Sequence, residues 1–187
     1  MRFVPWLLLS QLTLVAPAAG LALEAGRLVG LTHSFDARTV YCPTARHFTL
    51  QPVAGGMTEA GYWYAANNFC AAEHGGTHMD APIHFAEIKP SVDQLPVTAG
   101  IGPLVKVDVS AAAAKDSDYR PSVDDVKAWE RKHGRIPRGA IVVMDSGWGK
   151  RWPDRNRYLG TDIEGDVKNL HFPGFSKEAA EFLVKER

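Results

Sequence analysis

The sequence lacks several features that mark specialised classes of protein. Its two cysteines, Cys42 and Cys70, allow one disulfide at most, and two free thiols are an equally good interpretation. Lys plus Arg and Asp plus Glu number 21 each, so the formal net charge is zero, and no basic block is present to neutralise nucleic-acid phosphates. The sequence contains no Asn-x-Ser/Thr sequon and no Gly-x-Ser-x-Gly motif. These absences argue against N-glycosylation, nucleic-acid binding and a serine hydrolase of the nucleophile-elbow type.

Long apolar runs are also scarce, and the clearest one lies at the amino terminus. "FVPWLLLSQLTLV" follows Arg2, and "APAAGLA" then supplies small residues at the spacing that signal peptidase requires. The run is shorter than the roughly 20 apolar residues that span a bilayer. The sequence therefore predicts a secretory signal peptide at residues 1–20, a secreted location and no membrane attachment after cleavage.

The rest of the chain mixes strand and helix patterns, which indicates an α/β class. "PLVKVDVS" places valines at alternate positions on one face, and Ser122 and Asp125 have the spacing of a helix capping box. Gly134 is expected to end that helix, and Ser176 is expected to cap the final one. The continuous apolar run "AIVVMD" predicts a strand buried on both faces. Strands are expected at residues 27–35, 46–53, 61–73, 103–110 and 140–145, helices at 123–133 and 177–187, a turn at 55–56 and a loop at 146–160.

The segment "EHGGTHMDAPIHF", residues 73–85, concentrates histidines and acidic residues in one short run. Its two glycines and Pro82 disfavour a helix, because Gly costs about 0.8–1.0 kcal/mol relative to Ala in a helix interior and Pro costs more. In an extended chain, His78, Asp80 and His84 fall on one side, and Pro82 limits the stretch to an edge or irregular strand. The glycines allow His74 to bend back toward His78.

This combination of side chains suggests a metal site. Two imidazoles and a carboxylate suit zinc, manganese or iron, and they leave coordination positions for water and substrate. A histidine that is merely buried and hydrogen-bonded is the simpler alternative. The density of ligand-type side chains in this segment favours a catalytic metal site over that alternative.

The same run resembles the signature of the cyclase-like metal-dependent hydrolases, the family of bacterial kynurenine formamidase and isatin hydrolase. "LTHSF", "NNFCAAEHGGTH", "IVVMDSGWGKRW" and "FPGFSKEAAEFLVKER" extend the resemblance over nearly all of the chain that follows the signal peptide. The resemblance implies one hydrolase domain at residues 21–187, with a mixed sheet that forms a partly open β-barrel with flanking helices. It also implies a homodimer or a larger homo-oligomer.

By position, the resemblance implies that His74, His78 and Asp80 bind zinc or manganese and that His84 is the catalytic histidine. Members of the family hydrolyse a C–N bond in an aryl formamide such as N-formylkynurenine, a step of tryptophan catabolism, or in a cyclic lactam such as isatin. The metal would lower the pKa of water to about 7. His84 would act as general base and then as general acid, a role worth roughly 10²–10⁴-fold in rate. The expected activity is that of an arylformamidase or an isatin hydrolase.

The family pattern continues beyond this sequence. Members carry a further strand, a "GxDT.S.D" segment, and a late histidine and glutamate that complete the metal centre, whereas this sequence ends at Arg187. The alternative expectation is a truncated homologue that is secreted and binds metal but is catalytically inactive.

Four further residues are site candidates by residue type. Trp63, Trp148 and Trp152 are expected to wall a pocket for a small aromatic amide or lactam, although tryptophans are as often part of a core. Glu73, beside His74, is expected to orient a metal ligand, with an exposed charge as the alternative.

Overall fold

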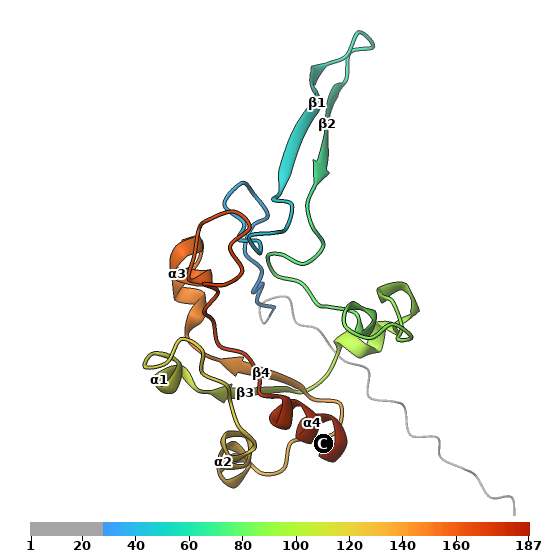
Figure 1. The fold of residues 1–187 in the computed structure, drawn as a ribbon. Coiled ribbons are helices and arrows are strands. Elements are labelled where there is room, and N and C mark those ends of the chain that lie inside the picture. The colour runs from blue at the N-terminus through green and yellow to red at the C-terminus, as the bar shows by residue number, and fades with distance from the viewer. Residues whose placement is uncertain (1–27) are drawn as a thin grey trace, which may run out of the picture. The chain divides into compact units, whose positions relative to one another are not determined.

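The computed structural model describes residues 28–187, and the signal peptide predicted at residues 1–20 lies outside that range. The chain divides into two units, Met1–Leu31 and Thr32–Arg187, and the second contains every helix and strand of the described range (Figure 1). Between residues 28 and 187, no helix combines the length and the apolar character needed to cross a membrane.

A β–α–β arrangement forms the centre of the second unit. Strands β3 (Leu104–Asp108) and β4 (Ile141–Asp145) pair in parallel, and helices α1 (Ser110–Ala113) and α2 (Val123–His133) lie between them in the chain. Parallel strands need a crossover of this kind, because the chain must return to the starting end of the sheet before the second strand begins, and a tight turn joins only antiparallel strands. Helix α4 (Lys177–Glu186) packs against α2. Figure 1 shows both helices beside the β3–β4 pair.

The hydrophobic core lies between this sheet and its helices. Its buried members are Val105, Val107, Val109, Val126 and Ile136. On β4, Val142 and Met144 pack against this cluster, but Ile141 is 38% exposed and Val143 is 41% exposed. The prediction of a β4 strand buried on both faces is therefore wrong. The sheet has two strands and the core covers one face of it, so β4 follows the same alternation as β3.

The predicted helix caps are confirmed. The Ser122 hydroxyl accepts a hydrogen bond from Asp125 N–H at 3.3 Å, and the Asp125 carboxylate accepts one from Ser122 N–H at 2.7 Å. Helix α2 ends at Gly134, whose φ of 88° favours glycine. The Ser176 hydroxyl accepts from Ala179 N–H at 3.1 Å and begins α4.

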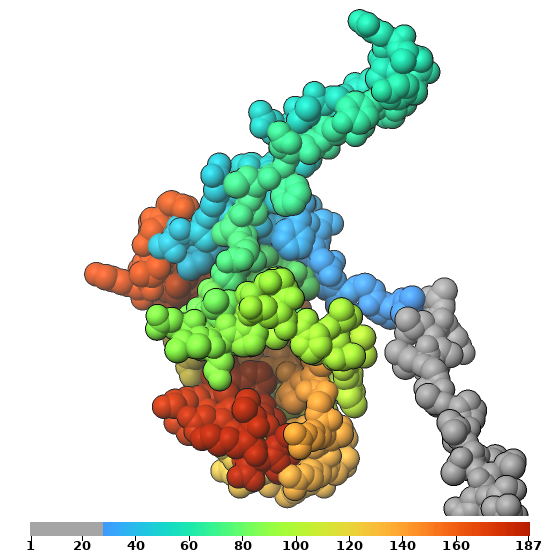
Figure 2. Space-filling view, turned by 90° about the vertical axis from the view of Figure 1, so that its right-hand side faces the viewer, coloured from blue at the N-terminus to red at the C-terminus, as the bar shows by residue number. Residues whose placement is uncertain are grey.

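The other sheet is a hairpin of β1 (Thr49–Met57) and β2 (Trp63–Cys70), which pair antiparallel. The turn predicted at residues 55–56 is wrong, because both glycines lie within β1 and pair with Ala65 and Tyr64. The chain reverses at residues 58–62 instead, where Thr58 and Tyr62 exchange hydrogen bonds. Figure 2 shows the hairpin, in cyan and green, with no other element packed on the face in view.

The predicted β-barrel is absent from residues 28–187. The four strands form two separate two-stranded sheets, because β1 and β2 pair with each other and β3 pairs with β4. The predicted strand at the start of the chain is wrong for residues 28–35, which have no regular structure. The predicted loop at 146–160 contains a 3-10 helix at Trp148–Arg151 and helix α3 at Arg155–Leu159. Both cysteines are free thiols.

A bidentate ion pair joins α2 to the end of α4. Arg187 Nε and Nη2 donate to the two carboxylate oxygens of Glu130 at 2.6 and 2.7 Å, and the two side chains are only 12% and 13% exposed. Glu130 also accepts from Ile136 N–H at 3.0 Å. The hydrogen bond from Arg187 is the largest of the effects that lower the pKa of Glu130 from 4.5 to about 2, and burial opposes it.

Glu130→Gln is expected to destabilise the fold in a pH-dependent way. Because folding lowers this pKa, the ion pair stabilises the protein above pH 4.5 and loses its contribution as the pH falls toward about 2. The variant should lower the free energy of unfolding at neutral pH by about 2–3 kcal/mol, since one pKa unit corresponds to about 1.4 kcal/mol. Urea unfolding at neutral pH and at successively lower pH measures the difference.

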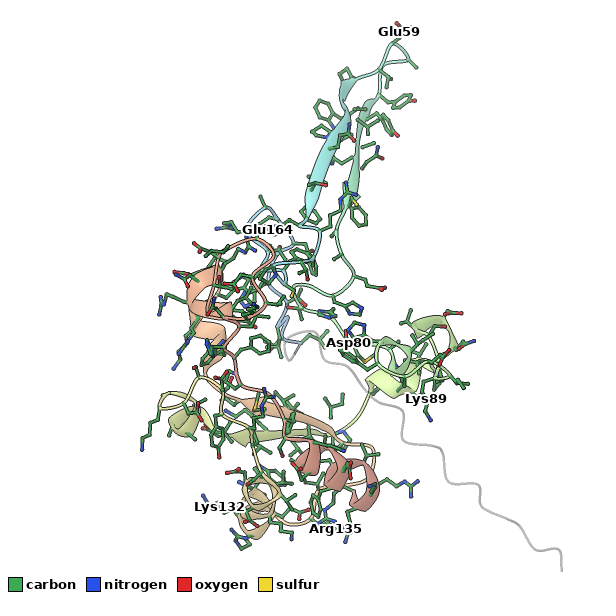
Figure 3. All side chains as sticks on the ribbon, viewed as in Figure 1. Glu59, Asp80, Lys89, Lys132, Arg135 and Glu164 are labelled. Carbon is green, nitrogen blue, oxygen red and sulfur yellow. The ribbon has the colours of Figure 1, made fainter. Side chains whose placement is uncertain are left out.

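Glu59→Gln provides the matched control for that experiment. Glu59 lies at the exposed tip of the β1–β2 hairpin (Figure 3), so its neutralisation should leave stability unchanged. A Glu130→Gln variant as stable as the wild type at neutral pH, or equally destabilised at every pH, would contradict the role given to the ion pair.

Candidate metal centre

The histidine cluster lies on the segment that follows β2. Residues 71–81 have no helix or strand, as the glycines predict, but the segment continues into a 3-10 helix at Pro82–His84 rather than the expected edge strand. Proline suits the first position of this helix, because its missing N–H would have no partner there. The segment is anchored at Gly75, which forms an isolated antiparallel bridge with Tyr41. Gly76 adopts a φ of 66°, a conformation that favours glycine.

Three side chains of this segment converge on one point. The Asp80 oxygen Oδ1 lies 2.6 Å from His74 Nδ1 and 3.0 Å from His78 Nε2. One ligand-type atom from each of these residues lies within 4.8 Å of the others. Asp80 is 46% exposed and the two imidazoles are about one-third exposed, so the group is open to small ions and water. Figure 3 shows Asp80 between β2 and the short helices that follow.

The hydrogen bonds around His78 indicate why a cation fits here. His78 Nδ1 lies 3.2 Å from the carbonyl oxygen of Gly76, which can only accept, so Nδ1 carries the proton. In the neutral ring, Nε2 then presents a lone pair to an oxygen of the Asp80 carboxylate. Two acceptors at this distance repel each other unless a proton or a metal ion lies between them. The donor set of two imidazoles and a carboxylate therefore fits a divalent metal.

The charge state of Asp80 agrees with a ligand role. Partial burial raises the pKa of its carboxyl, but the hydrogen bond with His74 and the electrostatic attraction of the nearby imidazoles of His78, His74 and His84 together hold the pKa below its ordinary value. Asp80 is therefore a carboxylate at neutral pH. A carboxylate is the form that binds metal ions.

His84 lies beside this group and faces a cavity. Its ring centroid is 3.5 Å from that of His74, and the ring is exposed. A cavity of about 430 Å³ adjoins both histidines, and its lining mixes polar and apolar side chains. The apolar wall comes from Met79, Ile83 and Val92, none of which the sequence identified. These three side chains come together through the 3-10 helices at Pro82–His84 and Val92–Gln94, and no periodic pattern in the sequence predicted those helices.

The remaining site candidates, Glu73 and the three tryptophans, lie in different parts of the structure. Glu73 Oε1 lies 3.5 Å from His74 Nε2, and its side chain is 88% exposed. Trp63 is 67% exposed on β2, and Trp148 is buried and donates its indole N–H to Tyr158 O at 2.7 Å. Trp152 stacks on His33 with ring centroids 4.8 Å apart. The cavity beside His84 is lined by none of the three tryptophans.

Comparison with known proteins assigns the chain to a family. Residues 29–187 match the family described as "Putative cyclase". The chain belongs to this cyclase family. It is also 37% identical over 131 residues to an isatin hydrolase of Roseibium aggregatum, an alignment that covers 68% of this chain and 48% of that protein.

Solved structures of cyclase-family relatives share the fold. Isatin hydrolase A from Ralstonia solanacearum is 32% identical with a TM-score of 0.73, and the match covers 85% of this chain and 62% of that one. Isatin hydrolase A from Labrenzia aggregata, bound to benzyl benzoate, is 33% identical with the same TM-score and covers 85% and 63%. An isatin hydrolase bound to the product analogue thioisatinate is 30% identical, with a TM-score of 0.68.

The relatives are isatin hydrolases, two of them solved with a small molecule bound, and they are longer than this chain. The cyclase-family chain spans about half (48%) of the Roseibium aggregatum protein and less than two thirds of the solved isatin hydrolases. The comparisons therefore show the family and the fold of this chain.

Proposed function

We propose that this cyclase-family chain is a metal-dependent hydrolase that cleaves the amide C–N bond of a cyclic lactam of the isatin type. The observation that carries the proposal is the convergence of His74, His78 and Asp80 on one point beside an open cavity. The isatin hydrolases among its relatives support the lactam as substrate. An aryl formamide, which presents the same aromatic amide in open form, is the second substrate that we propose.

The chain's own residues have separate roles in this proposal. His74, His78 and Asp80 would hold zinc or manganese, which when bound supplies Lewis acidity for activating water and polarising a carbonyl oxygen. The Met79, Ile83 and Val92 wall would bind the aromatic ring by apolar contact. Glu73 would steady His74 through their ion contact.

His84 would move the protons. Its ring lies against His74 and lines the cavity, so it can accept a proton from water as the new C–O bond forms. It can then donate that proton to the ring nitrogen as the C–N bond breaks. Opening of the lactam ring gives a single product molecule that carries both a carboxylate and an aromatic amine. Of the three tryptophans proposed as pocket walls, Trp152 lines a second cavity of about 210 Å³, whereas Trp63 and Trp148 line neither of these two cavities.

Turnover by the metal-loaded chain tests this proposal. The purified chain is incubated with Zn²⁺ or Mn²⁺, its bound metal is measured, and hydrolysis of isatin and of N-formylkynurenine is followed by absorbance. We expect metal-dependent ring opening of isatin. Bound metal without turnover of either compound would contradict hydrolysis and favour the alternative of an inactive metal-binding homologue.

We also propose that the chain is exported and forms homo-oligomers. Amino-terminal sequencing of protein recovered outside the cell tests the first point: cleavage between Ala18 and Ala22 would give a first residue between Ala19 and Leu23. Light scattering on the purified chain tests the second, since a monomer mass would contradict it.

A further inference from the structure

The turn between the two candidate histidine ligands rests on an earlier segment of the chain. Residues 33–41 have no helix or strand, yet Thr39, Val40 and Tyr41 are almost fully buried, at 3%, 5% and 1% exposed. The segment contacts the turn at several points: His33 N–H donates to Thr77 Oγ1 at 3.4 Å, and Tyr41 forms the bridge with Gly75.

Tyr41 makes the closest of these contacts. A Cβ atom at position 75 would overlap the Tyr41 ring, so the ring fills the space beside Gly75 that a side chain would take. A Cβ at position 76 would overlap the Phe35 ring at 2.8 Å and approach Thr39 Cγ2 at 3.3 Å. The two glycines are therefore required by the packing of the turn, because any larger residue would push the turn away from the segment beneath it.

We propose that Tyr41 is a positioning residue for the candidate metal ligands. Its backbone pairs with Gly75, the residue next to His74, and its ring supports the turn that leads to His78. Loss of this support would leave His74 and His78 free to move apart, so that their nitrogens no longer meet the Asp80 carboxylate. The inference rests on the proposed function for the identity of the ligands, and on the packing alone for the conformation of residues 74–80.

The ring, rather than the hydroxyl, performs this role. The Tyr41 hydroxyl oxygen is buried and has no hydrogen-bond partner among the described residues, and burial raises the pKa of this phenol. An unpaired buried hydroxyl contributes nothing to holding the turn, and its removal leaves the ring in place. Tyr41→Phe is therefore the matched control for variants that remove the ring.

Cobalt(II) titration of four proteins tests the proposal. Co²⁺ alone is added to the wild type, Tyr41→Ala, Tyr41→Phe and Val126→Ala, and both affinity and visible absorption are recorded, since the spectrum reports ligand geometry. Val126 is fully buried in the core between β3 and α2, so its truncation lowers stability away from the turn. All four are compared under conditions where circular dichroism shows them folded. Should Tyr41→Ala fail to fold, Tyr41→Leu replaces it.

The expected result separates Tyr41 from an ordinary core residue. Tyr41→Ala should bind Co²⁺ at least about 10-fold more weakly, the loss typical of residues that orient metal ligands, with an altered spectrum. Tyr41→Phe and Val126→Ala should keep the wild-type affinity and spectrum. Wild-type binding by Tyr41→Ala, or an equal loss in Val126→Ala, would overturn the proposal.

A second readout does not depend on metal. Amide hydrogen exchange at residues 74–80 should be faster in Tyr41→Ala than in Tyr41→Phe or Val126→Ala, relative to the rest of each protein. If the wild type binds no Co²⁺, the proposed function fails, while this exchange pattern still supports the positioning of the turn. Equal exchange rates at residues 74–80 in the three variants would overturn the positioning role of Tyr41.

Discussion

Asp80→Ala is expected to abolish metal binding and hydrolysis together. Asp80 Oδ1 is the atom on which both His74 and His78 converge, and its carboxylate is the one anionic member of the ligand group. Without it, two imidazoles remain to hold a divalent cation, and affinity should fall by at least about 100-fold. Hydrolysis should fall at least as far as it does on removal of an acid–base catalyst, roughly 10²–10⁴-fold.

Bound metal and turnover must be measured on the same preparation of this variant. Elemental analysis after dialysis gives the metal content, and absorbance gives the rate of isatin hydrolysis. Glu87→Ala serves as control, because it removes an exposed carboxylate from the adjacent segment without touching the ligand group. Full activity and wild-type metal content in Asp80→Ala would contradict the ligand assignment.

His84→Ala is expected to separate metal binding from catalysis. The His84 ring lies against that of His74 and lines the cavity, but it is outside the group of converging ligand atoms. The variant should retain wild-type metal content while kcat falls by roughly 10²–10⁴-fold, the contribution of general acid–base catalysis. A loss of metal as large as that in Asp80→Ala would instead make His84 a ligand.

A remote histidine provides the control for this second variant. His171 pairs with Asp118 at 2.8 Å, and both side chains are about half exposed. His171→Ala removes an imidazole without changing the cavity beside His74, so kcat and metal content should both stay near wild type. Turnover by His84→Ala at the wild-type rate would exclude the proton-transfer role.

The local features of the molecule could be predicted from the sequence. The convergence of the His74, His78 and Asp80 side chains was predictable because the three residues lie within seven positions, so a single bend brings them together. The helix caps at Ser122 and Ser176 were predictable for the same reason, since a cap depends on hydrogen bonds to the next turn of the helix.

Features that depend on distant parts of the chain could not be predicted. The barrel that the family resemblance implied does not form within residues 28–187, where β1 pairs with β2 and β3 with β4, and no local pattern determines pairing between distant strands. Gly55 and Gly56 suggested a turn but extend β1, where exposed strands tolerate glycine. The support of Gly75 by Tyr41 joins residues 34 positions apart, and the adjacent glycines were the one local signal of it.

The metal content of the folded wild-type chain tests the central claim most directly. The purified chain is stripped of metal, titrated with Zn²⁺ and with Mn²⁺, and analysed for bound ion after dialysis, with circular dichroism to show that it is folded. The ligand geometry of His74, His78 and Asp80 predicts stoichiometric retention of one of these ions. A folded chain that retains neither ion would contradict the metal centre and the chemistry proposed for it.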